Sequence, residues 1–145
     1  MANTQADVET LNSFLRGEIS AVETYRQAID HVSDDRIRTQ LEDCLQDHEH
    51  RVETLRERVE KLGGMPSEGS GPWGTFAKLV QGGADLLGEK MAIAALEEGE
   101  DRGLADYQSG MDKAHGEARR LVRMELLPAQ KRTHAQMSRL KKTLH

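Results

Sequence analysis

The chain carries one short fragment twice, and each copy places a carboxylate on a helix face that is otherwise mostly apolar. Glu18 follows a glycine and precedes Tyr25 by seven residues, and Glu100 follows a glycine and precedes Tyr107 by the same interval. An ionised carboxylate in a protein core costs several kcal/mol unless it is paired with a cation or bound to a metal. The repeat therefore predicts two related helices that share one buried polar site.

The residues around both fragments recur at alternating steps of three and four, which is the spacing of the buried stripe of a helix. The first stripe consists of Leu11, Leu15, Glu18, Val22, Tyr25, Ile29 and Val32. The second consists of Ile93, Glu97, Glu100, Leu104, Tyr107, Met111, Ala114, Ala118 and Leu121. Between them lies a third, which consists of Ile37, Leu41, Leu45, His48, Val52, Leu55, Val59 and Leu62. Together with an aromatic content of only 3%, these stripes predict an all-α protein.

Four helices follow from the stripes and from the signals at their ends. We expect them at about residues 7–32, 35–62, 89–113 and 117–144, with a cap near Asp34 and a break at Gly63. Pro128 falls inside the fourth helix, which either kinks there or starts afresh with the proline in its first turn.

Residues 63–88 form a long connection between the second and third helices. Loop-forming residues occupy its first part, and a short amphipathic helix is marked by Trp73, Phe76, Val80, Ala84 and Leu87. Consecutive antiparallel helices need only a few connecting residues, whereas parallel second and third helices require the chain to return along the full bundle. We therefore expect a single domain over residues 1–145: two antiparallel hairpins joined by a long crossover.

Composition excludes several functional classes. The net charge is −5, and basic residues are interleaved with acidic ones, so no nucleic-acid surface is indicated. We interpret the locally basic stretch 131–142 as the solvated face of the last helix.

No apolar run approaches the ~20 residues of a membrane span, and the N-terminus lacks a secretion signal. Cys44 is the only cysteine, which fits a core residue in a reducing compartment. We expect a cytoplasmic protein that contacts neither nucleic acid nor membrane.

Counting from the turns predicts which side chains face the two glutamates. Glu18 and His48 each lie fifteen residues from Ser33, so they should be level in the bundle. Glu100 and Arg132 each lie sixteen residues from Gly116 and should also be level, and Thr133 and His134 follow directly. Imidazole nitrogens and carboxylate oxygens suit iron, manganese or zinc. The candidate metal ligands are therefore Glu18, His48, Glu100 and His134.

Further residues extend this set. Glu97 lies one helical turn before Glu100, and Asp47 with His50 forms an i, i+3 pair that could chelate. The neighbours of His50 describe a polar outer face, so periodicity favours His48 over His50. Tyr25 and Tyr107 lie two turns beyond their glutamates, where each could donate a hydrogen bond that orients a carboxylate ligand.

A metal-free interpretation stays open beside this one. A buried glutamate can pair with an arginine or histidine, and such a polar layer fixes helix register without any chemistry. In that case Glu18, His48 and Glu100 specify the fold and bind no metal. The protein would then be structural or would bind other proteins, and a homodimer through Trp73 and Phe76 is one form this could take.

The repeated glutamates and tyrosines resemble the ferritin-like superfamily, and within it the small bacterial four-helix-bundle proteins of unknown function. The resemblance implies a di-iron or di-manganese site, with a Glu from the first and third helices and a Glu-x-x-His pair from each of the others. Glu18 and Glu100 match the first kind of ligand. The pairs are altered, because Leu45 stands three residues before His48 and Lys131 three before His134.

The sequence therefore predicts a ferritin-like bundle with a partly retained metal centre. We expect it to bind one transition metal, iron or manganese, or to act in a stress response. No nucleophile triad, phosphate loop or cofactor fingerprint is present, which disfavours an enzyme.

Overall fold

The computed structural model describes residues 2–69 and 88–144, and all regular structure in these residues is helical. The long helices are α1 (Ala2–Ile29), α2 (Asp35–Lys61) and α4 (Glu89–Met111). The last helical stretch is built from α5 (Gly116–Leu121), the π-helical segment η2 (Val122–Leu126) and α6 (Leu127–Thr143). The all-α prediction is thus confirmed, while the amphipathic helix expected around Trp73 and Phe76 lies outside the described residues.

The ends of α2 follow the predicted signals. The Asp34 side chain caps the helix by accepting hydrogen bonds from the backbone N–H groups of Arg36 and Ile37, at 2.8 and 3.1 Å. At the other end Gly63 has a φ of +85°, a conformation that costs glycine little.

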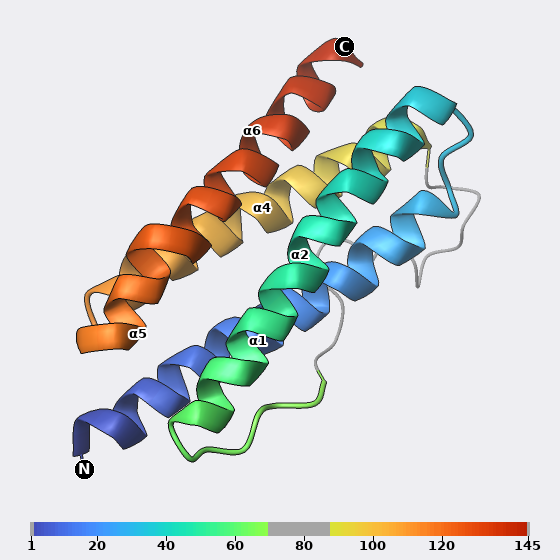
Figure 1. Ribbon diagram of the computed structural model, residues 1–145. Helices are drawn as coiled ribbons and strands as arrows, with labels where there is room; N and C mark the ends of the chain where they lie inside the picture. Colours follow the sequence, from blue (N-terminus) through green and yellow to red (C-terminus); the bar gives the residue numbers. More distant parts are fainter. Residues whose placement is uncertain (1, 70–87, 145) are drawn as a thin grey trace.

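Contacts at the two ends of the bundle fix the direction of α4. At one end, the Glu89 carboxylate accepts hydrogen bonds from the backbone N–H groups of Ser33 and Asp34, at 2.9 and 3.1 Å. At the other, the Asp7 carboxylate accepts one from the backbone N–H of His115 at 3.1 Å. Helix α4 therefore runs antiparallel to α1 and parallel to α2, so the end of α2 and the start of α4 lie at opposite ends of the bundle (Figure 1). The predicted crossover topology is confirmed.

The described start of the crossover is held against α1. Asn12 donates to the carbonyl of Met65 at 3.0 Å and accepts from the backbone N–H of Ser67 at 2.9 Å. The Arg16 guanidinium donates to the Ser67 hydroxyl at 3.1 Å. These bonds direct the chain along α1 as it leaves α2.

Pro128 neither breaks the last helix nor separates two helices. Residues 116–143 remain helical, and the π-helical segment η2 lies directly before the proline, with the N–H of Leu127 bonded to the carbonyl of Val122. A proline cannot donate to the preceding turn, and its ring crowds the carbonyl four residues back. The wider π turn accommodates both effects and adds one residue to the helix.

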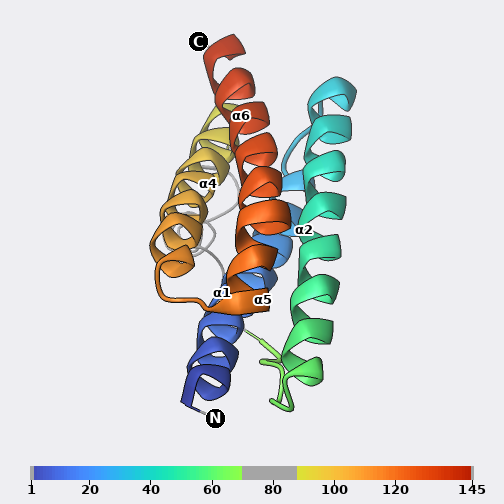
Figure 2. The same cartoon turned by 60° about the vertical axis from the view of Figure 1, so that its left-hand side comes forward.

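The α4–α6 hairpin packs beside the α1–α2 hairpin in Figure 2.

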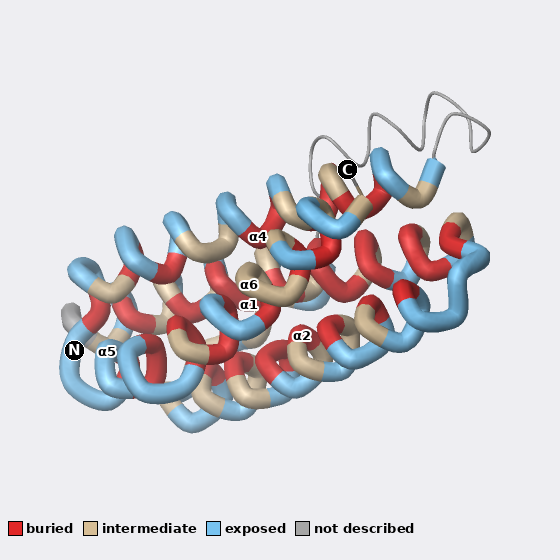
Figure 3. The backbone as a smooth tube through the Cα atoms, turned by 90° about the horizontal axis from the view of Figure 1, so that it is seen from above, coloured by how far each residue is buried: buried red, intermediate tan, exposed pale blue. Residues whose placement is uncertain are grey.

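The core consists of two apolar clusters, with polar side chains between them. One cluster contains Leu15, Leu55 and Leu121, and the other contains Leu41 and Met137. Buried residues line the inner faces of all the long helices in Figure 3. Cys44, expected in the core, is 1% exposed. None of the described helices is long and apolar enough to cross a bilayer.

Two glycine substitutions should change stability in opposite directions. A Cβ at Gly110 would lie 2.2 Å from the Cζ atom of the buried Phe14 ring, whereas a Cβ at Gly17 would meet nothing within 4 Å. We expect Gly110→Ala to lower the free energy of unfolding by about 1–3 kcal/mol through overpacking. Gly17→Ala should raise it by about 0.5–1 kcal/mol, because alanine loses less backbone entropy in a helix. Urea unfolding of both variants checks the pair, and equal effects would contradict the packing described.

Candidate functional site: a buried polar layer

Six polar side chains meet inside the bundle, and every long helical element contributes at least one. Each is at most 4% exposed. We call this group the polar layer, and it consists of Glu18 from α1, His48 and Arg51 from α2, Glu100 from α4, and Gln130 and Thr133 from α6.

His48 bridges the two repeated glutamates. Its Nδ1 lies 2.5 Å from Glu18 Oε1, and its Nε2 lies 2.8 Å from Glu100 Oε2. A neutral imidazole has only one N–H, so two carboxylate acceptors are satisfied only when both ring nitrogens are protonated. The geometry therefore favours an imidazolium cation between two carboxylates.

Arg51 uses its whole guanidinium inside the protein. It donates from Nε to Asp47 at 3.0 Å and from one terminal nitrogen to Glu18 at 3.3 Å and to Gln130. Its other terminal nitrogen donates to the carbonyl of Ala129 at 3.2 Å and to the Thr133 hydroxyl at 3.0 Å. The five N–H groups of an arginine can supply all five contacts, so this side chain joins α1, α2 and α6.

Gln130 and Thr133 connect Arg51 to the second glutamate. The Gln130 amide nitrogen donates to Glu100 Oε1 at 2.8 Å and to the Glu100 carbonyl at 2.9 Å. The Thr133 hydroxyl accepts from Arg51 and donates to Glu100 Oε1 at 2.7 Å. Gln130 and Thr133, which are both neutral, thus link the Arg51 cation to the Glu100 carboxylate through hydrogen bonds.

Each tyrosine of the repeat donates a hydrogen bond to the glutamate of the other copy. Tyr25 of α1 donates to Glu100 Oε2 at 2.5 Å, and Tyr107 of α4 donates to Glu18 Oε2. Burial is the main cause that raises the pKa of both phenols well above 10, followed by the neighbouring carboxylate. Both tyrosines therefore stay neutral donors, and each copy of the repeat completes the hydrogen bonding of the other.

Ion pairing within the layer keeps Glu18 and His48 in their charged forms although both side chains are buried. Burial by itself would raise the pKa of Glu18, but the charges of Arg51 and His48 and the hydrogen bonds from His48 and Tyr107 hold it at about 2. Burial would likewise lower the pKa of His48, but Glu18 and Glu100 raise it to about 9. Two carboxylates and two cations make the layer electrically neutral, which is the condition for keeping charges in a core.

The remaining candidate ligands lie outside the layer. His134 is 24% exposed on α6 and approaches Asp101 and Glu97. Asp47 is half-buried and pairs with Arg51, and His50 is exposed. The structure therefore brings together Glu18, His48 and Glu100 of the predicted set and places the other candidates elsewhere.

Sequence reasoning missed Arg51, Gln130 and Thr133 as members of the site. The count about Gly116 was one residue short because of the π turn, and Thr133 takes the core position that the count gave to Arg132. A signal was present: His48 with Arg51 and Gln130 with Thr133 repeat the i, i+3 spacing of a Glu-x-x-His pair with other residue types.

The pairing predicts how stability depends on pH. The pKa of His48 rises from 6.5 to about 9 on folding, so its contribution is complete below pH 6.5 and is lost as the pH rises through 9. The pKa of Glu18 falls from 4.5 to about 2, so its contribution is complete above pH 4.5 and is lost as the pH falls through 2. Thermal unfolding should show a plateau between pH 4.5 and 6.5 and a declining alkaline limb. His48→Gln should flatten that limb, and an equal slope in the variant would refute the assignment.

Loss of Arg51 should destabilise the fold strongly. Arg51→Met leaves Glu18 without one of its two cations, and breaking a buried ion pair costs about 3–5 kcal/mol. Arg56→Met is the matched control, because Arg56 is 39% exposed and its ion pair with Glu53 lies on the surface, where a pair contributes about 0–1 kcal/mol. Guanidinium unfolding measures both, and similar losses would contradict the special position of Arg51.

Comparisons with known proteins agree with this fold. No curated protein matches the chain. A crystal structure described as ferritin like, diiron-carboxylate proteins from Bacillus anthracis str. Ames superposes with a TM-score of 0.69 at 19% identity, covering 99% of this chain and 96% of that one. The family described as Domain of unknown function (DUF2383) matches residues 6–113. The chain therefore belongs to the DUF2383 family and has a ferritin-like fold.

Proposed function

We propose that this protein is a helical bundle whose polar layer holds no metal and has a structural or protein-interaction role. In this proposal the polar layer occupies the place where a ferritin-like diiron-carboxylate protein carries its metal ions. The observation that supports it is the guanidinium of Arg51, which is 2% exposed and hydrogen-bonded to Glu18, Gln130 and Thr133 within the layer.

The residues of the layer do not fit a pair of iron ions. The superfamily pattern calls for a Glu-x-x-His pair on the second and fourth helices. At the same spacing this chain has His48 with Arg51 and Gln130 with Thr133. Only two carboxylates remain, where the pattern has four, and an arginine cannot lose its proton to become a ligand.

The ligand atoms that remain are already engaged. Each oxygen of Glu18 and of Glu100 accepts at least one hydrogen bond, and both nitrogens of His48 face a carboxylate. A metal ion entering here would have to break these bonds and to approach the Arg51 cation in a medium of low dielectric constant. The donor set therefore disfavours iron or manganese in the core.

Charge gives the layer its role in this proposal. Glu18 and Glu100 would be too costly to bury alone, and the cations of His48 and Arg51 neutralise them as metal ions would. Because each pair joins different helices, the layer also fixes their register, which is the best-attested use of buried polar groups. The outcome is a bundle whose core supports no oxygen or iron chemistry.

Restoration of the superfamily ligands tests the proposal. The variant His48→Glu, Arg51→His, Gln130→Glu and Thr133→His has four buried carboxylates and no cation, so its metal-free form should be unstable. Ferrous iron under nitrogen should raise its melting temperature, because binding to the folded state alone stabilises that state. After desalting, elemental analysis should find two more iron ions per chain in this variant than in the unmodified protein.

The matched control is Glu18→Gln in the otherwise unmodified chain. We expect it to leave the metal content of the protein unchanged after loading with iron or manganese. Two iron ions per chain in the unmodified protein, lost in Glu18→Gln, would overturn the proposal.

A further inference from the structure

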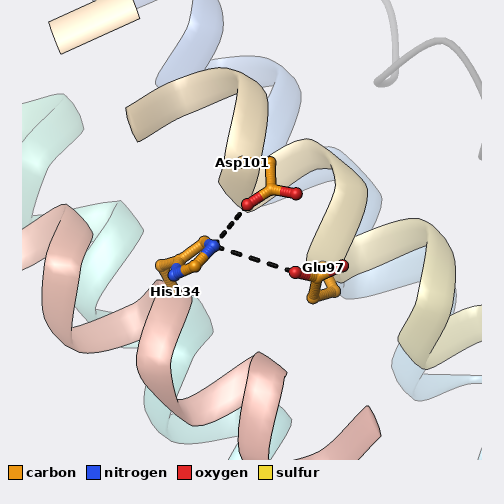
Figure 4. A group of neighbouring side chains, drawn as sticks. All are labelled: Glu97, Asp101 and His134. Atoms are coloured by element: carbon orange, nitrogen blue, oxygen red, sulfur yellow. Dashed lines mark hydrogen bonds and ion pairs between the residues drawn. The ribbon is translucent and has the colours of Figure 1, made fainter. Parts of the chain in front are cut away.

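Outside the polar layer, three potential ligands converge between α4 and α6. Glu97 and Asp101 are four residues apart on α4 and so lie on one face of that helix. His134 of α6 points its imidazole between them (Figure 4). One ligand atom from each residue can be chosen so that all three lie within 4.8 Å of one another.

We propose that Glu97, Asp101 and His134 bind one divalent cation of the zinc class. One imidazole nitrogen and two carboxylate oxygens are a ligand set that zinc accepts, and a site with three protein ligands leaves a fourth position for water. This site is separate from the polar layer and does not depend on the function proposed above.

The distances suit an ion of this size. His134 Nε2 lies 3.7 Å from Glu97 Oε2 and is hydrogen-bonded to Asp101 Oδ1. Ligand atoms bound tetrahedrally to zinc at about 2.0–2.1 Å are separated by about 3.4 Å. Binding therefore requires small side-chain adjustments, in which the metal replaces the hydrogen bond between His134 and Asp101.

The cluster is open to solvent on one side, and its more buried carboxylate is held in place by neighbouring side chains. The Asp101 side chain is 60% exposed, so an ion and its water can reach the site from solvent. Glu97 is only 14% exposed and is held by Lys141 at 3.3 Å and by Ser138 at 3.4 Å. The more buried carboxylate is thus positioned before the ion arrives, which reduces the entropy lost on binding.

Charge also favours a divalent ion. Glu97 and Asp101 carry two negative charges, which one divalent cation neutralises when His134 is in its neutral form. Lys141 contacts Oε1 of Glu97, whereas Oε2 faces His134. The lysine therefore competes with the ion through charge but leaves the oxygen nearest the imidazole available.

Calorimetric titration of the full chain with zinc chloride tests the site. We expect one zinc ion per chain, and Asp101→Asn or His134→Gln should weaken binding at least about tenfold. His50→Gln and His115→Gln are the matched controls, since each removes a histidine outside the cluster, and both should bind as the unmodified protein does. Circular dichroism verifies that each variant remains folded.

The proposal fails if zinc does not bind, or if Asp101→Asn and His134→Gln bind as tightly as the unmodified protein, which would mean an adventitious ion only. NMR gives a second readout, because the His134 ring signals should shift at one equivalent of zinc. A shift confined to other histidines would also overturn the site. Neither failure affects the proposal for the polar layer, which Glu18→Gln and the four-residue variant test separately.

Discussion

The structure depends on the neutralisation of two buried carboxylates, Glu18 and Glu100, by cations from within the chain. His48 lies between them and Arg51 reaches Glu18 from one side, so that α1, α2 and α4 meet at one ionic group. Buried ion pairs are rarely more stable than a well-packed apolar core. Their value here is geometric, because any slip of one helix by a residue leaves a charge without its partner.

Much of this arrangement was predictable from local patterns. Stripes at steps of three and four defined the helices, and the length of the connection at 63–88 predicted the crossover topology. Equal distances from Ser33 placed His48 level with Glu18, because an antiparallel hairpin preserves such a count. These inferences succeeded because each depends on one helix or one turn.

The rest required knowledge of the three-dimensional packing. The π turn before Pro128 adds one residue to the last helix, so the count from Gly116 gave Arg132 where the structure has Thr133 in the core. Arg51 was missed because arginine beside an apolar stripe normally reaches solvent. Only the packing of α6 against α2 reveals that its guanidinium has three partners on the last helix: Gln130, Thr133 and the carbonyl of Ala129.

The protonation state of His48 tests the account most directly, since only an imidazolium can donate a hydrogen bond to both Glu18 and Glu100. Nitrogen-15 NMR of the imidazole ring distinguishes protonated from unprotonated nitrogens. The account predicts that both ring nitrogens of His48 carry a proton at pH 7 and that one is lost only as the pH approaches about 9. A neutral ring at pH 7, with one nitrogen unprotonated, would contradict it.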